Sequence, residues 1–163
     1  MNTPTKIIVM GVSGCGKSSI GSRLAKRLGL KFFDGDDYHP PENVAKMSQG
    51  IPLNDEDRAE WLTKLNELLN NEACAVVACS GLKPHYRAQL TEGNGAVLVY
   101  LKGDMETIWS RHQQREGHFF AGKIMLESQF RDLIEPTQHE AIHIDIRQSP
   151  DAIVDTIVSA LSA

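Results

Sequence analysis

The sequence predicts an α/β fold in which helices cover both faces of a parallel sheet. Short apolar runs rich in β-branched residues alternate along the chain with longer segments whose apolar residues recur at helical spacing. The first apolar run is followed by a glycine-rich loop, GVSGCGKSS, and then by a helical pattern. This alternation favours a parallel sheet, because each parallel connection needs a helix to return the chain to the same edge.

The expected elements follow from these patterns in chain order. Segments with the length and composition of strands are residues 7–12, 31–33, 75–79, 96–101 and 142–146. Segments with helical spacing are residues 17–28, 41–47, 55–70, 84–91, 104–116, 124–134 and 150–161. Asp55, Asp104 and the pair Ser149-Pro150 stand at helix starts, where these residue types are favoured. The least regular stretches are expected to form loops or lids: residues 34–40, 49–54 and 117–123.

Length and composition limit the class of protein. A chain of 163 residues with 41% hydrophobic content is expected to form one domain, residues 1–163. The formal net charge of -4 argues against a general binder of nucleic acid or anionic membranes. The three cysteines contain no CxxC pair, so neither a disulfide framework nor a zinc site is indicated. With no leader pattern and no long apolar run, we expect a soluble cytoplasmic protein.

The glycine-rich loop matches the phosphate-binding pattern GxxxxGK[ST]. In this pattern successive backbone N–H groups surround a phosphate, Lys17 reaches the outer phosphates and Ser18 is suited to Mg²⁺. The helix that opens at Gly16 adds the partial positive charge of its N-terminus. The loop is therefore expected to bind a nucleoside triphosphate. The expected contacts are Gly11, Val12, Ser13, Gly14, Cys15, Gly16, Lys17, Ser18 and Ser19.

Acidic residues follow the second expected strand. In FFDGDD, Asp34 and Asp36 are two residues apart, so their side chains share a direction if the strand continues. At the carboxyl edge of the sheet, one carboxylate could hold a water bound to Mg²⁺, and the other could orient and deprotonate a substrate hydroxyl. The alternative interpretation is a solvated turn.

Two groups of basic residues are candidates for contacts with anions. Arg111 and Arg115 share one helix face and precede the glycine-containing segment EGHFFAGK, so a closing lid could bring them to the migrating phosphoryl group. Lys83, His85 and Arg87 form a second cluster, suited to an anionic substrate. Solvated helix surfaces are the alternative interpretation of both groups.

Other nucleotide and metal motifs are missing or misleading. The chain has no Asn-Lys-x-Asp motif, and Ser80 and Gly81 follow the strand at 75–79 where an acidic residue would be expected in many NTPases. Asp145 is interpreted as a structural or capping acid. HEAIH at residues 139–143 matches HExxH, but that zinc motif requires a helix, whereas AIHIDI alternates with the period of a strand. A metalloprotease is therefore not expected.

Several stretches spread over most of the chain resemble one family, the gluconokinases, which are small phosphate-loop kinases related in fold to shikimate and adenylate kinases. The matching stretches are MGVSGCGKS, DGDDYHPPENVAKMSQGIPLNDEDRAEWL, CSGLKPHYR, YLKGD, GHFF, SQF and EP. The resemblance implies a three-layer α/β/α P-loop kinase fold with a five-stranded parallel sheet of order 2-3-1-4-5 and a mobile lid near residues 112–124. It also implies phosphorylation of D-gluconate at its terminal hydroxyl by ATP with Mg²⁺, and a homodimer.

The resemblance also implies roles for individual residues. Lys17, Asp36, Arg111 and Arg115 would be catalytic, with Asp36 as the acid that positions the substrate and Asp34 holding Mg²⁺ through water. The residues implied to contact the sugar acid are Asp36, His39, Arg58, Lys83, Arg87 and His118. Arg111 would also contact the nucleotide, and Arg147 and Pro150 belong to the loop expected beside the adenine. Two alternatives stay open: another small-molecule kinase, acting on shikimate or a nucleotide, and a non-enzymatic NTP-binding switch.

Overall fold

A five-stranded parallel sheet forms the centre of the molecule. The computed structural model describes residues 5–116 and 120–162, with only the backbone described for residues 112–116 and 120–122. The strands are β1 (Lys6–Met10), β2 (Lys31–Asp34), β3 (Ala75–Ala78), β4 (Val97–Lys102) and β5 (Ala141–Asp145). Their order is β2-β3-β1-β4-β5, and every pairing is parallel. The predicted fold class and strand order are confirmed.

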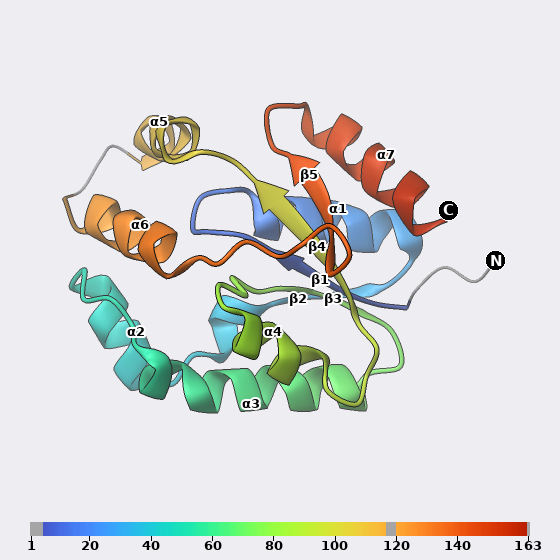
Figure 1. Ribbon diagram of the computed structural model, residues 1–163, viewed down its shortest axis with the longest axis horizontal. Helices are drawn as coiled ribbons and strands as arrows, with labels where there is room; N and C mark the ends of the chain where they lie inside the picture. Colours follow the sequence, from blue (N-terminus) through green and yellow to red (C-terminus); the bar gives the residue numbers. More distant parts are fainter. Residues whose placement is uncertain (1–4, 117–119, 163) are drawn as a thin grey trace.

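Helices cover both faces of this sheet and complete three layers. They are α1 (Lys17–Leu28), α2 (Pro41–Ser48), α3 (Asp55–Asn71), α4 (Pro84–Thr91), α5 (Met105–Glu116), α6 (Phe120–Asp132) and α7 (Pro150–Leu161). Helices α1 and α7 pack together on one face, and α3 and α4 pack together on the other (Figure 1). Within the described ranges, no helix combines the length and hydrophobicity that a membrane span requires.

The sheet directs its strand ends toward one side of the molecule. The arrows of β1 and β4 point toward the side that carries α2, α5 and α6 (Figure 1). Strand β1 lies in the middle of the sheet, and Ile7 to Met10 are fully buried. A strand covered on both faces requires a nearly continuous apolar run, which explains the composition of β1. The buried strand therefore gives the glycine-rich loop that follows it a rigid base.

The segment after β2, which was expected to be a loop, folds into a short helical turn. Strand geometry ends at Asp34, and residues Gly35–Tyr38 form a 3₁₀ helix, η1. The Asp34 side chain accepts a hydrogen bond from the backbone N–H of Asp36 at 3.0 Å, and Trp61 donates through Nε1 to the carbonyl of Gly35 at 2.7 Å. These two bonds favour a turn, so Asp34 and Asp36 do not share a strand face. The condition for their common direction, a strand that continues past Asp34, is not met.

Two further sequence interpretations can be compared with the structure. The helix expected at residues 124–134 begins earlier and ends earlier, as α6. Residues 139 and 140 lie in a turn and residues 141–143 belong to β5, so the two histidines of HEAIH do not lie on one helical turn. The interpretation of this motif as misleading is confirmed. The single domain and the lid at residues 112–124 stay predictions; much of that lid lies outside the described side chains.

Helix α3 begins with a capping box centred on Asn54, one residue before the expected Asp55. Asn54 accepts from the backbone N–H of Asp57 at 2.8 Å, and Asp57 accepts from the backbone N–H of Asn54 at 3.0 Å. Lys46 of α2 donates to the same carboxylate at 2.9 Å. This cap fixes the start of the helix that carries Arg58 and Trp61, two residues that line a cavity beside the glycine-rich loop.

We expect Asn54→Ala to lower the free energy of unfolding by about 1 kcal/mol, because one N–H at the start of α3 loses its acceptor. Denaturant unfolding followed by circular dichroism measures the change. Asn71→Ala, at the exposed far end of the same helix, is the matched control and should change stability much less. Equal effects of the two substitutions would contradict a stabilising cap at Asn54.

Candidate active site

The glycine-rich loop turns sharply at the end of β1. Gly11 has φ 151° and Gly16 has φ 97°, backbone conformations that side chains with a Cβ rarely adopt. A Cβ on Gly11 would also lie 2.6 Å from Sγ of Cys15, which is buried beneath the loop. The backbone N–H of Gly11 donates to the carbonyl of Ser80 at 3.2 Å, so the loop is held against the end of β3. The loop therefore has a defined shape.

The start of α1 offers donors for an anion. Gly16 is the N-cap residue and supplies no side-chain acceptor, so no capping side chain takes the first N–H groups of the helix. Nζ of Lys17 lies 3.5 Å from the carbonyl of Val12, across the loop. Burial raises the pKa of the Cys15 thiol, although nearby Lys17 lowers it, so this side chain stays neutral. The positive charge of the loop thus comes from Lys17 and the helix N-terminus.

Asp34 and Ser18 meet beside this loop. Ser18 donates through Oγ to Oδ2 of Asp34 at 2.8 Å. The contact brings a hydroxyl oxygen and a carboxylate oxygen together, and oxygen ligands of this kind are those that Mg²⁺ prefers. The structure therefore joins the two residues that the sequence predicted for magnesium.

A cavity of about 230 Å³ opens next to the loop. Its lining residues come from the loop, η1, α2, α3, α6 and the end of β3. They are Ser13, Lys17, Asp36, His39, Met47, Leu53, Arg58, Trp61, Ser80, Met125 and Gln129. Asp36, His39 and Arg58, which the sequence predicted for the substrate, thus line one cavity with Lys17. A cavity that holds an ammonium, a carboxylate and a guanidinium is suited to a small polar anion.

His39 forms part of the aromatic wall of this cavity. Its ring stacks on Trp61 with centroids 4.2 Å apart, and only 3% of its side chain is exposed. Nδ1 of the ring lies 3.2 Å from Nδ2 of Asn43. Burial lowers the pKa of His39, although the charge of Asp36 opposes that shift. His39 is therefore a neutral polar group at pH 7.

Arg58 projects from α3 into the same cavity. The side chain is nearly buried, and Nη1 donates to Oη of Tyr86 at 3.0 Å and to Oδ2 of Asp132 at 3.2 Å. Its guanidinium carbon also lies 5.4 Å from the centroid of the Tyr86 ring. Among the described residues, both hydrogen bonds that the Arg58 side chain donates come from Nη1. These two bonds hold the guanidinium in place by one edge.

The structure does not bring Lys83 and Arg87 of the second basic cluster into the lining of this cavity. Arg87 is 1% exposed, and it donates to Glu140 at 2.9 Å through Nε and to the carbonyl of Gly81 at 2.8 Å through Nη1. Lys83 pairs with Asp55 at 2.9 Å, a contact that raises the pKa of the lysine. A buried cation needs such partners to offset its desolvation. The structure therefore gives both residues structural contacts.

Three residues predicted to contact the nucleotide, of which Arg147 and Pro150 were predicted for the adenine side, gather around the loop after β5. Arg111 donates to the carbonyl of Ile146 at 2.8 Å, and Pro150 is the first residue of α7. Arg147 pairs with Asp145 at 2.8 Å, and this contact lowers the pKa of Asp145 to about 2. Arg111 and Arg147 are thus brought to the same loop, and Asp145 has the structural role expected of it.

Two residues that the sequence predicted for the site have no described side chain. The side chain of Arg115 and all of His118 fall outside the described residues. Their predicted roles in the lid and at the substrate stay predictions.

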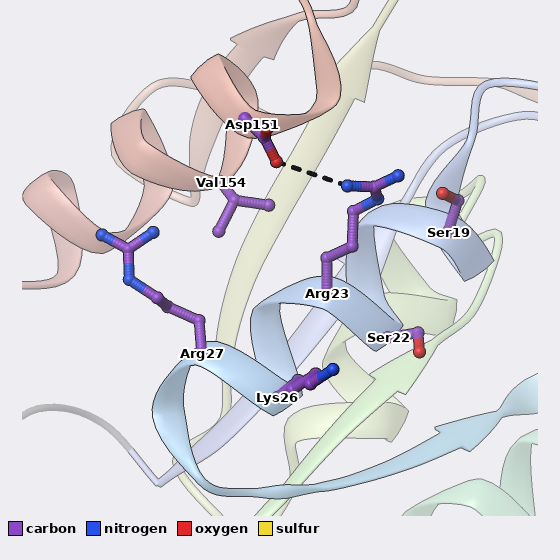
Figure 2. A pocket seen from close by; sticks show the side chains of 7 residues that line it. All are labelled: Ser19, Ser22, Arg23, Lys26, Arg27, Asp151 and Val154. Carbon is purple, nitrogen blue, oxygen red and sulfur yellow. Dashed lines mark hydrogen bonds and ion pairs between the residues drawn. The ribbon is translucent and has the colours of Figure 1, made fainter.

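A second hollow lies between α1 and α7, away from the acids and the loop lysine. It is more open, with a volume of about 590 Å³, and its lining residues are Ser19, Ser22, Arg23, Lys26, Arg27, Asp151 and Val154. Figure 2 shows Arg23 of α1 directed toward Asp151 of α7, with which it pairs at 3.3 Å. Arg27 similarly pairs with Asp155 at 2.8 Å. Ser19 therefore lies on this outer face and does not line the polar cavity.

Sequence reasoning assigned no role to several residues of the cavity. These are Met47, Leu53, Trp61, Ser80, Met125 and Gln129. Trp61 and Gln129 lie in stretches that carried the family resemblance, so the signal was present without a role attached to it. Only the packing of α6 against the loop and α3 reveals that Gln129 belongs to the site.

A phosphate loop joined to a cavity that holds a carboxylate and an arginine defines the molecule as a P-loop kinase of small molecules. The family model described as shikimate kinase matches residues 13–162. The chain is 42% identical to the thermoresistant gluconokinase of Escherichia coli K12, over 94% of this chain and 91% of that protein, and 47% identical to the thermosensitive gluconokinase of the same strain, over 85% and 78%. A crystal structure of a gluconokinase from Sinorhizobium meliloti 1021 matches with TM-score 0.91 and 39% identity, over 99% of this chain and 94% of that one. The chain belongs to the gluconokinase family, within the wider shikimate kinase family.

The lowered pKa of His39 predicts a loss of stability in acid. In the unfolded chain the ring takes up a proton near pH 6.5, whereas the folded protein binds that proton only at lower pH. The unfolded state therefore binds more protons as the pH falls below 6.5, and the free energy of unfolding should decrease in that range. NMR titration of the ring should give a midpoint below 6.5. A midpoint above that value would contradict the buried, neutral ring.

Proposed function

We propose that this protein phosphorylates D-gluconate with ATP and releases 6-phospho-D-gluconate and ADP. The observation that carries the proposal is the cavity that joins Lys17, Asp36 and Arg58 in a chain of the gluconokinase family. Each end of the reaction has a suitable partner there: a cationic loop for the triphosphate, a carboxylate for the attacking hydroxyl and a guanidinium for the acid group of the sugar. No observation in the structure favours the NTP-binding switch.

Arg58 is the residue that we assign to the gluconate carboxylate. An arginine can bind a carboxylate through two parallel N–H···O bonds, and it keeps its charge even where it is nearly buried. Tyr86 and Asp132 engage Nη1 and hold the guanidinium in position. Lys83 is paired with Asp55 and Arg87 with Glu140. Of these three basic residues, all predicted to contact the sugar acid, Arg58 is the one that lines the cavity.

Asp36 is assigned to the hydroxyl that is phosphorylated. In the transfer the hydroxyl oxygen forms a bond to the γ-phosphorus as the bond from that phosphorus to the bridging oxygen of ADP breaks. The hydroxyl proton passes to the Asp36 carboxylate. Because phosphoryl transfer needs little covalent help from the protein, the main contributions are alignment by Asp36 and charge neutralisation by Lys17 and the loop N–H groups.

Ser18 and Asp34 fit the Mg²⁺ ion that accompanies ATP. Their oxygens lie together at the loop, and Mg²⁺ usually keeps several waters while it binds one or two protein oxygens and the phosphates. Ser18 would bind the ion directly and Asp34 would bind it through water. The ion would neutralise charge on the phosphates, while the protein residues fix their positions.

The remaining assignments rest on the family and on position in the fold. Arg111 and Arg115 are proposed to neutralise charge on the migrating phosphoryl group, and Arg147 and Pro150 to lie beside the adenine. Arg111 already contacts the loop that contains Arg147 and leads into Pro150. The homodimer and the cytoplasmic location stay predictions.

A panel of acceptors tests the function. D-gluconate, shikimate and nucleoside monophosphates are supplied with MgATP, and ADP release is measured. With MgATP present, we expect turnover only when gluconate is the acceptor. Lys17→Ala should have the melting temperature of the wild type but lose nearly all activity, because the charge on the phosphates is no longer neutralised. Preferred turnover of another acceptor, or an active Lys17→Ala protein, would overturn the assignment.

We expect Asp36→Asn to lower kcat by about a hundred-fold or more, because the amide cannot accept the hydroxyl proton. Asp37→Asn is a matched control, since this neighbouring carboxylate is exposed and does not line the cavity. Steady-state kinetics with saturating gluconate and ATP measure both variants. Equal kcat for Asp36→Asn and wild type would exclude Asp36 as the residue that takes the proton.

A further inference from the structure

Helix α6 presents one face to the cavity. Met125, Gln129 and Asp132 are four and three residues apart, so they lie on the same side of the helix. Met125 and Gln129 line the cavity, and Asp132 binds Arg58 at 3.2 Å. The same helix therefore contributes to the cavity wall and holds the residue assigned to the sugar acid.

Gln129 connects this helix to the phosphate loop. Its Oε1 accepts a hydrogen bond from the backbone N–H of Ser13 at 2.6 Å, although the two residues are 116 positions apart in the chain. A backbone N–H can only donate, so the atom that faces Ser13 must be the oxygen of the carboxamide. This contact settles which way the amide group points.

The orientation leaves Nε2 of Gln129 as a donor at the cavity. Within the described residues this nitrogen has no hydrogen-bond partner, and Gln129 is only half-buried. The other strong donors in the lining, Lys17 and Arg58, are cations and are assigned to the phosphates and the carboxylate. A polyhydroxy acid also presents neutral hydroxyl groups between its two ends, and a neutral amide donor matches their chemistry.

We propose that Gln129 determines specificity for the acceptor, with Nε2 donating to one hydroxyl of the sugar-acid chain while Oε1 holds Ser13. The proposal rests on the proposed function, because it takes the acceptor to be a polyhydroxy acid. One side chain then ties the acceptor to the loop that holds the triphosphate. The contact favours acceptors with a hydroxyl at that position, because an acceptor without it leaves a polar group of the site unpaired.

Two substitutions separate the two ends of the amide. Gln129→Met keeps the length of the side chain and removes both hydrogen bonds. Gln129→Glu keeps an oxygen that can accept from Ser13 but loses the donor. The matched control is Glu127→Gln, an exposed residue two positions earlier on α6. Melting temperatures establish that each variant is folded, and affinity for a non-hydrolysable ATP analogue, measured without acceptor, reports on the loop alone.

The decisive measurement is kcat/KM for gluconate and for a set of gluconates that each lack one hydroxyl. We expect Gln129→Met to lower kcat/KM for gluconate about ten-fold relative to the wild type, mainly by raising KM. For the one analogue that lacks the contacted hydroxyl, the variant and the wild type should have equal kcat/KM. Gln129→Glu can still accept from Ser13 and from a hydroxyl, so it should keep a preference for gluconate over that analogue, but its added charge should lower kcat/KM for every anionic acceptor. Glu127→Gln should match the wild type throughout.

The same experiment distinguishes the two ways of failing. If the wild-type protein does not phosphorylate gluconate, the proposed function is wrong, whatever the variants do. If the wild type is active and Gln129→Met carries the same penalty on every analogue, or no penalty, Gln129 does not contact the acceptor and the inference is overturned. Should Gln129→Met melt well below the wild type, Gln129→Leu, which also lacks both hydrogen bonds, is measured in its place and decides between the same results.

Discussion

The site depends on one constraint of the parallel sheet: the strands that supply it all end at the same edge. Strand β3 lies between β1, which leads into the phosphate loop, and β2, which leads into Asp34 and Asp36. Neighbouring strands are about 4.8 Å apart, so the ends of β1 and β2 are separated by about 10 Å. That separation leaves room for an acceptor beside the end of β3, where Ser80 lines the cavity. The order of the strands, rather than any single residue, therefore creates the space in which transfer takes place.

The cations around this space differ in whether a carboxylate neutralises their charge. Arg87 is paired with Glu140 and Lys83 with Asp55, and both pairs support the start of α4. Arg58 is paired with Asp132 but still lines the cavity. Lys17 instead lies near a backbone carbonyl, which cannot neutralise its charge. Because an ion pair already satisfies much of the charge of its members, the electrostatic attraction for an incoming anion is concentrated at Lys17 and at the free edge of Arg58.

Much of the fold was predictable because it depends on patterns that repeat locally. Strand β1 and helix α1 were expected within two residues of their observed ends, since the buried apolar run and the glycine-rich loop mark the boundary between them. A loop after β2 was expected, but its form as a 3₁₀ helix was not, because that form depends on the indole of Trp61, which binds the carbonyl of Gly35 from 26 residues away. The pairing of Arg87 was not predictable for the same kind of reason: its partner Glu140 is 53 residues away, and spacing along the chain carries no information about that pairing.

The sequence by itself determined the class of fold, the phosphate loop and the acids that follow β2, because glycine conformation, strand period and helix spacing are local properties of the chain. The tertiary structure decided which basic residues face the cavity and which are paired with carboxylates of other segments. It also decided that Gln129 of α6 reaches the phosphate loop across 116 residues. Such contacts depend on the packing of helices over the sheet edge, since only packing determines which side chains are desolvated together and which remain open to a substrate.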